Sequence, residues 1–162
     1  MYKRQRGEKE GPQKTIHIIC GEGSGTDSAR RLLLRGFRVS LGVLNIGDTD
    51  QITGKTLGLP MALEKPFSPI SGRSVEENRS LIDKADLVVL ERFHIGRGNL
   101  ANLQAALEAL TKGKRVIALE NNLEYDFAGG EAKEYYQRLK EGGALFIPDH
   151  SRLLEEVEKA LG

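Results

Sequence analysis

The stretch that decides the fold of this chain is TIHIICGEGSGTDSARRLLLRG, residues 15–36. Residues 15–20 form a short, nearly all-apolar and β-branched run, which is typical of a strand buried on both faces of a parallel sheet. Glycines at positions 21, 23 and 25 interrupt this run, and Thr26 follows as an N-cap. A helical apolar face comes next and ends at Gly36. The stretch therefore predicts a strand that leads through a glycine turn into a helix.

This glycine turn suits a bound ligand. Glycine lets the backbone approach a ligand closely, and the first N–H groups of a helix point outward, which favours phosphate or another anion. The spacing departs from the dinucleotide fingerprint, in which the third glycine comes one residue later. Glu22 would also repel phosphate unless it points away or accepts from a donor on the ligand. A tight turn without any ligand therefore stays open as the alternative.

Composition indicates one soluble domain. The chain has 162 residues, of which 39% are hydrophobic and 29% charged. We expect residues 1–14 to be a flexible basic linker or tail and residues 15–162 to form the domain. A net charge of +1 and 6% aromatic residues do not favour a nucleic-acid partner. The single cysteine and the absence of a long apolar run predict a cytoplasmic protein without direct membrane insertion.

Strand-like and helix-like segments alternate along the rest of the chain. Five further strands are expected, at residues 38–44, 60–63, 86–90, 114–119 and 144–147. Residues 66–72 contain two prolines and are expected to form a stiff loop. Because crossovers between parallel strands are right-handed, the pattern predicts an α/β fold. We expect a single three-layer α/β/α Rossmann-like domain with a mainly parallel sheet, ordered 3-2-1-4-5-6.

A second glycine-bearing turn follows the fourth predicted strand, and Asn99 there suits the cap of the next helix. In the predicted order the first and fourth strands are neighbours, at the point where the winding direction reverses. Ligands of open α/β sheets bind at that point, outside the carboxyl ends of the strands. Both glycine turns meet there. The expected ligand-binding residues are Gly21, Glu22, Gly23, Ser24, Gly25, Thr26, Glu91, Phe93, Gly96, Gly98, Asn99 and Asn102.

Two other signals do not support a site. Residues 53–56, TGKT, look like the end of a P-loop, but Thr49 stands where the motif needs glycine, and no strand directly precedes the loop. His17, His94 and His150 are scattered, so each is expected to be a structural or surface residue. We therefore expect neither a metal centre nor an ATPase active site.

Several stretches resemble the LOG, or lysine-decarboxylase-like, Rossmann superfamily: residues 21–26, 85–90, 96–99 and 112–119. Members of that superfamily bind nucleotides or related ligands, and some cleave nucleoside monophosphates to the free base. The hydrolytic members carry Pro-Gly-Gly-x-Gly-Thr-x-x-Glu, whose glutamate acts on the sugar. In this chain Asn99 stands in place of the threonine and Asn102 in place of the glutamate. The resemblance implies a nucleotide or phosphorylated ligand, with Glu91 or Glu22 as the carboxylates that could replace the missing one.

Four stretches look closer still to the domain that follows the ATPase in some cobalamin and iron-siderophore ABC transporters: residues 18–25, 42–50, 66–71 and 98–103. The resemblance spans roughly residues 15–160. It implies a non-catalytic ligand-binding domain whose partner is the transporter ATPase and which is membrane-peripheral through that partner. A phosphoribohydrolase-like enzyme of the LOG type, a pure interaction domain and a homodimer stay open as alternatives.

Overall fold

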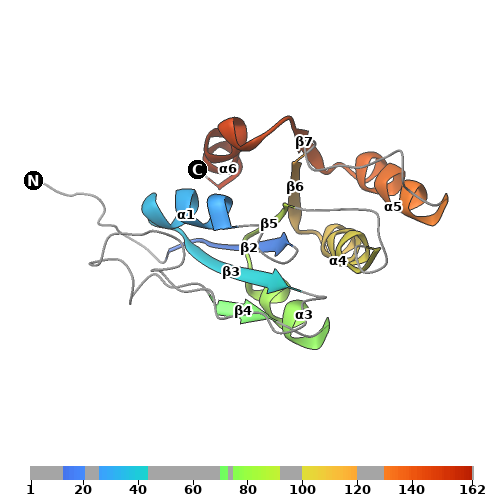
Figure 1. Cartoon of the computed structure of the whole chain (residues 1–162), viewed down its shortest axis with the longest axis horizontal. Helices are drawn as coiled ribbons and strands as arrows, with labels where there is room; N and C mark the ends of the chain where they lie inside the picture. The colour runs from blue at the N-terminus through green and yellow to red at the C-terminus, as the bar shows by residue number, and fades with distance from the viewer. Residues whose placement is uncertain are drawn as a thin grey trace, which may run out of the picture.

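A parallel sheet of six strands forms the centre of the protein in a computed structural model (Figure 1). The structure describes residues 13–20, 26–43, 70–72, 75–91, 100–119 and 130–161. The strands are β2 (Thr15–Cys20), β3 (Arg38–Val43), β4 (Ile70–Gly72), β5 (Leu87–Leu90), β6 (Arg115–Leu119) and β7 (Leu145–Ile147). Their order in the sheet is β4-β3-β2-β5-β6-β7.

The observed order confirms the predicted 3-2-1-4-5-6 arrangement, but one edge strand is not where the sequence placed it. The strand that pairs with β3 is β4, with Ser40 opposite Ile70. This strand lies in the stretch 66–72, so the prediction of a loop is wrong for its last three residues. The predicted strand at residues 60–63 lies outside the described residues. β4 has the sequence Ile-Ser-Gly and directly follows Pro69, so it carries only one large apolar side chain and no strand pattern marks it.

Helices cover both faces of the sheet and make it the middle of three layers (Figure 1). On one face α1 (Thr26–Leu34) and α6 (Leu153–Leu161) pack on alternate residues of the strands, including Ile18 and Val89. On the other face lie α3 (Val75–Lys84), α4 (Leu100–Thr111) and α5 (Gly130–Glu141). Because β5 alternates between the two cores, all four of its residues are buried, as a central parallel strand requires.

A buried polar cluster interrupts the core beneath α3. The His17 ring lies 2.8 Å from Ser40 Oγ through Nδ1 and 3.0 Å from Asn78 Oδ1 through Nε2. An amide oxygen only accepts, so Nε2 carries the hydrogen and Nδ1 accepts from the Ser40 hydroxyl. Burial lowers the pKa of His17 to about 4, and the Asn78 bond opposes that shift in part. The prediction that His17 is structural is therefore confirmed.

Gly42 makes room for this cluster. A Cβ atom at position 42 would lie 1.9 Å from Asn78 Oδ1 and 2.6 Å from His17 Nε2. No side chain tolerates contacts that short. The missing side chain at Gly42 on β3 is thus what allows Asn78 on α3 to reach the ring of His17 on the same face of the sheet.

Glycines also follow the ends of two helices, and one of them, Gly36, is the helix end that the sequence predicts. After α1, Gly36 has φ +100°, and the next residue, Phe37, donates its N–H to Leu32 O at 3.1 Å. After α5, Gly143 has φ +99°, and Ala144 donates to Leu139 O at 3.0 Å. Both are left-handed C-terminal caps, which glycine adopts without steric cost.

Within the ranges that the structure describes, no helix has both the length and the apolar character needed to cross a membrane.

Candidate ligand-binding site

Two helices begin at the carboxyl edge of the sheet, at the point where the winding direction reverses. β2 and β5 are neighbouring parallel strands there, and Ile19 is level with Leu90 near their carboxyl ends. α1 is the next helix after β2 and begins at Thr26, while α4 is the next after β5 and begins at Leu100. This is the place where open α/β sheets bind ligands. The predicted reversal between the first and fourth strands is confirmed.

Glu91 is the centre of a polar cluster at this edge. It follows β5 directly, is only 3% exposed, and donates its backbone N–H to Ile19 O at 2.9 Å. One carboxylate oxygen, Oε2, accepts a hydrogen bond from the hydroxyl of Ser28, in the first turn of α1. The other oxygen, Oε1, lies 2.7 Å from His150 Nε2. Glu91 therefore joins three segments that are far apart in the sequence.

His150 comes from a single 3-10 turn, η3 (His150–Arg152), which follows β7. Asp149 caps this turn by accepting a hydrogen bond from the Ser151 N–H at 2.8 Å. The hydrogen bond to Glu91 raises the pKa of His150, with nearby carboxylates adding to the shift and burial opposing it. His150 thus holds a positive charge beside the buried carboxylate more readily than a free histidine does.

Asp27 lies on the open side of the same ring. Its Oδ2 atom is 3.8 Å from His150 Nδ1, which is longer than a hydrogen bond. The same oxygen accepts from Arg31 Nε at 3.1 Å, one turn along α1. The cluster at this edge therefore carries two carboxylates, an imidazole and a guanidinium in close contact.

The cluster differs from a nucleophilic triad. In such a triad the serine hydroxyl donates to the histidine, which takes its proton during attack. Here the Ser28 hydroxyl donates to Glu91, and the His150 Nε2–H donates to the other oxygen of the same carboxylate. His150 is therefore not placed to activate Ser28, and the arrangement suits holding elements or a ligand in place. Among the described residues, no group of three or more His, Cys, Asp or Glu side chains could hold a metal ion.

The predicted site residues have different outcomes. Glu91 lies in the cluster, and Thr26 is the first residue of α1, so it lies inside the helix and its role as a cap stays a prediction. Asn102 is 1% exposed in the first turn of α4. The other nine lie outside the described residues, and their roles stay predictions: Gly21, Glu22, Gly23, Ser24, Gly25, Phe93, Gly96, Gly98 and Asn99.

Sequence reasoning missed Ser28 and His150. The expectation that His150 is a scattered structural or surface residue is corrected by its contact with Glu91. One sequence signal could have found it, because His150 follows the last strand closely, just as Glu91 follows the fourth. The carboxyl ends of parallel strands share one edge of the sheet. Ser28 gives no comparable signal, since a serine in the first turn of a helix is ordinary.

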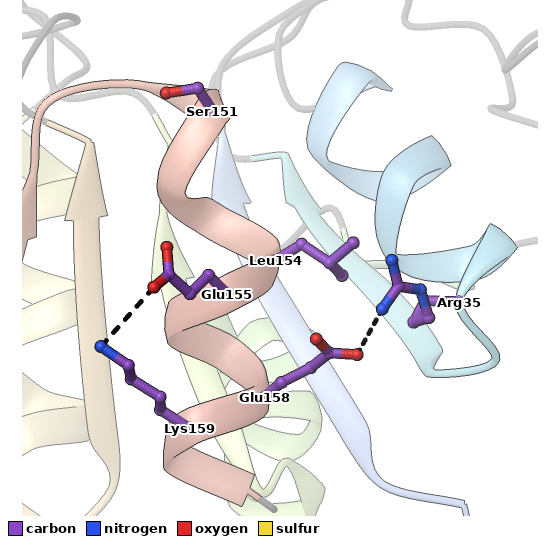
Figure 2. A pocket seen from close by; sticks show the side chains of 6 residues that line it. All are labelled: Arg35, Ser151, Leu154, Glu155, Glu158 and Lys159. Atoms are coloured by element: carbon purple, nitrogen blue, oxygen red, sulfur yellow. Dashed lines mark hydrogen bonds and ion pairs between the residues drawn. The ribbon is translucent and has the colours of Figure 1, made fainter.

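A groove of about 610 Å³ runs along α6 and the end of α1. Figure 2 shows that Arg35 and Glu158 face each other between α1 and α6, while Lys159 and Glu155 pair along α6 itself. Arg35 Nη1 lies 2.6 Å from Glu158 Oε2, and Lys159 Nζ lies 3.7 Å from Glu155 Oε2. These exposed pairs stabilise little and leave no net charge to attract an ion. The cluster around Glu91 is therefore the better candidate site.

Solved structures share the fold at low sequence identity. An FMN-dependent cysteine decarboxylase, TvaF, from thioviridamide biosynthesis is similar over 92% of this chain and 98% of its own, with a TM-score of 0.55 and 14% identity. The terminal R domain from the myxalamid PKS-NRPS biosynthetic pathway is similar over 84% of this chain and 48% of its own, with a TM-score of 0.50 and 16% identity. At such identities the likeness shows the α/β fold alone.

Two relatives are similar in sequence. The cobalamin import ATP-binding protein BtuD of Halobacterium salinarum is 31% identical over 77 residues, which are 47% of this chain and 19% of BtuD. The chain thus matches about a fifth of BtuD. The uncharacterized protein MJ0874 of Methanocaldococcus jannaschii is 30% identical over 83 residues, which are 51% of this chain and 89% of that protein.

The model of the MJ0874 family matches residues 39–154, well over half of the chain. The matched residues include Glu91, Asn102 and His150, whereas Asp27 and Ser28 precede them. With the likeness to most of the Methanocaldococcus jannaschii protein, this match shows that the chain belongs to the MJ0874 family.

Proposed function

We propose that this chain is a non-catalytic small-ligand-binding domain that works with the ATPase of a cobalamin or iron-siderophore ABC importer. Its ligand is a nucleotide or another phosphate-bearing molecule, bound at the carboxyl ends of β2 and β5. The two glycine turns, at residues 21–25 and 96–98, contact the ligand through the backbone. In this proposal Asn99 and Asn102 supply polar contacts to the ligand, and Phe93 supplies an apolar contact.

The likeness to BtuD supports the association with an importer. It covers 47% of this chain but only 19% of BtuD, so it concerns one part of a larger protein. The chain has no P-loop, because Thr49 replaces the glycine that the motif needs. The proposed role is therefore that of a module that accompanies an ATPase and responds to a ligand.

The observation that carries the binding role is the hydrogen bonding of the Glu91 carboxylate. Ser28 donates to one of its oxygens and His150 to the other. A carboxylate that activates water or stabilises an oxocarbenium ion needs an oxygen directed at the substrate. Glu91 instead directs its oxygens at α1 and η3, which supports a role in positioning these elements around a ligand.

The rival function is cleavage of nucleoside monophosphates, as in hydrolytic LOG proteins. A buried carboxylate at the point of reversal favours it, since Glu91 is the described carboxylate best placed to substitute for the missing catalytic glutamate. Asn102 opposes it, because a neutral amide neither activates water nor stabilises a positive sugar. The two functions predict opposite results in one assay.

We expect no free base when the purified protein is incubated with AMP, GMP, CMP or UMP and the products are separated by chromatography. The reason is that the carboxylate required on the sugar side is missing at Asn102. Steady release of base that disappears in Glu91→Gln would promote the hydrolase function to first place. Glu134→Gln, on the exposed face of α5, is the matched control and should behave as the unaltered protein.

The importer half of the proposal predicts a physical partner. After mild cross-linking in the native cell, capture of this chain should recover the ATPase of a cobalamin or siderophore importer. The reason is that the matched part of BtuD belongs to such an ATPase. Recovery of the chain without any transport component would favour a free-standing sensor or enzyme.

A further inference from the structure

Asp27 and His150 present an acceptor and a donor to the same small space. His150 Nδ1 and Asp27 Oδ2 are 3.8 Å apart, too far for a hydrogen bond between them. An oxygen atom placed at about 2.8 Å from each would bond to both. The two side chains are also accessible, with His150 22% and Asp27 52% exposed. The separation therefore fits one bridging oxygen.

Both groups are held in place by a second partner. Glu91 Oε1 accepts from His150 Nε2 at 2.7 Å, which fixes the ring and turns Nδ1 away from the buried carboxylate. Arg31 Nε donates to Asp27 Oδ2 at 3.1 Å, which orients that carboxylate on α1. Groups that are already oriented lose less conformational entropy when a ligand binds. Asp27 and His150 are therefore already oriented to bind a polar group of a ligand.

The charges of Asp27, Glu91 and His150 determine which chemical group of a ligand can bind between Asp27 and His150. A phosphate oxygen only accepts, so Asp27 and Glu91 would both repel it. A hydroxyl accepts from His150 Nδ1–H and donates its own hydrogen to Asp27 Oδ2. We propose that Asp27 and a doubly protonated His150 bind one sugar hydroxyl between them. The inference rests on the proposed ligand-binding function, and it names a ribose-bearing nucleotide as the ligand class.

The contact depends on the proton of His150. In the neutral ring Nε2 keeps its hydrogen for Glu91, so Nδ1 becomes an acceptor beside the acceptor Asp27. A single hydroxyl hydrogen then cannot serve both. The groups that face or flank His150 are Glu91 at the end of β5, Asp27 and Arg31 on α1, and Asp149 and Arg152 in its own segment. The raised pKa of His150 keeps the contact intact toward neutral pH, and binding weakens as the pH rises through that pKa.

The test is calorimetric titration at pH 6 with AMP and with its 2′,3′-dideoxy analogue. The unaltered protein should bind AMP at least 10-fold more tightly, because the analogue lacks the hydroxyl that makes both hydrogen bonds to Asp27 and His150. His150→Gln and Asp27→Asn should bind the two nucleotides with equal affinity. Asp83→Asn on α3 is the matched control, since Asp83 is 58% exposed and pairs with Lys112, and it should keep the 10-fold preference. The preference should also shrink as the pH is raised through the pKa of His150.

The outcomes separate the inference from the proposed function. Equal affinities of the unaltered protein for AMP and the dideoxy analogue would overturn the hydroxyl contact while leaving a nucleotide site in place. A bridging water in place of the hydroxyl gives that same result. Failure of both nucleotides to bind would overturn the nucleotide-binding function and the inference with it. A preference that survives in His150→Gln would assign the hydroxyl to other residues.

Discussion

Gly42→Ala is expected to lower the free energy of unfolding by about 2–5 kcal/mol. The added Cβ would lie 1.9 Å from Asn78 Oδ1 and 2.6 Å from His17 Nε2. Asn78 must then move away, which leaves the buried His17 Nε2–H without that acceptor. Urea unfolding followed by circular dichroism measures the loss.

Gly36→Ala provides the control for this prediction. Gly36 has φ +100°, and a Cβ atom added there would meet nothing within 4 Å, so its substitution strains the backbone without a clash. It should cost about 1–2 kcal/mol. Adding Asn78→Ala to Gly42→Ala should cost less than the sum of the two single changes, because the clashing amide is gone. A Gly42→Ala variant as stable as the unaltered protein would show that the cluster under α3 can rearrange freely.

The second prediction with a large expected effect concerns the free energy of unfolding at acidic pH. Burial lowers the pKa of His17 to about 4 in the folded protein, against 6.5 for an ordinary histidine. Between pH 6.5 and 4 the unfolded chain binds a proton at this histidine and the folded chain does not. The contribution of neutral His17 to the free energy of unfolding is therefore fully present above pH 6.5 and decreases as the pH falls toward 4. The loss should reach about 3 kcal/mol. Chemical unfolding at a series of pH values measures it.

His17→Gln should remove that dependence. Glutamine keeps a polar side chain at the site but does not titrate, so the difference in stability between the two proteins should change across pH 6.5 to 4. His150 contributes with the opposite sign, because its raised pKa stabilises below pH 6.5 and the gain is lost as the pH rises through its folded pKa. Parallel stability curves for the unaltered protein and His17→Gln between pH 4 and 6.5 would contradict the buried neutral state of His17.

The sequence predicted the fold where strands are buried on both sides. The run of β2 and the Leu-Val-Val-Leu of β5 are apolar throughout because each faces two cores, and such runs are visible without any structure. The edge strand β4 was missed because Ile-Ser-Gly carries only one large apolar side chain and follows a proline, whereas the equally short β7 is apolar throughout. Pairing with β3, which is a tertiary contact, makes it a strand.

The candidate site was predictable only in part. Glu91 could be predicted as a site residue because a charged residue directly after a buried strand must lie at the edge of the sheet. Its partner His150 is 59 residues away, and their contact depends on the way β5, β6 and β7 line up in the sheet. Ser28 faces Glu91 because α1 packs over the strands next to β5. Such contacts follow from packing, which no local pattern encodes.

The central claim is that a nucleotide binds intact at the carboxyl ends of β2 and β5. The most direct measurement is a ¹H–¹⁵N NMR titration with AMP, in which free adenine would be detected in the same tube. We predict shifts that concentrate at Ser28, Glu91, Asn102 and His150, with no adenine released. Shifts confined to the groove beside Arg35 and Glu158, the absence of any shift, or accumulation of adenine would contradict the account.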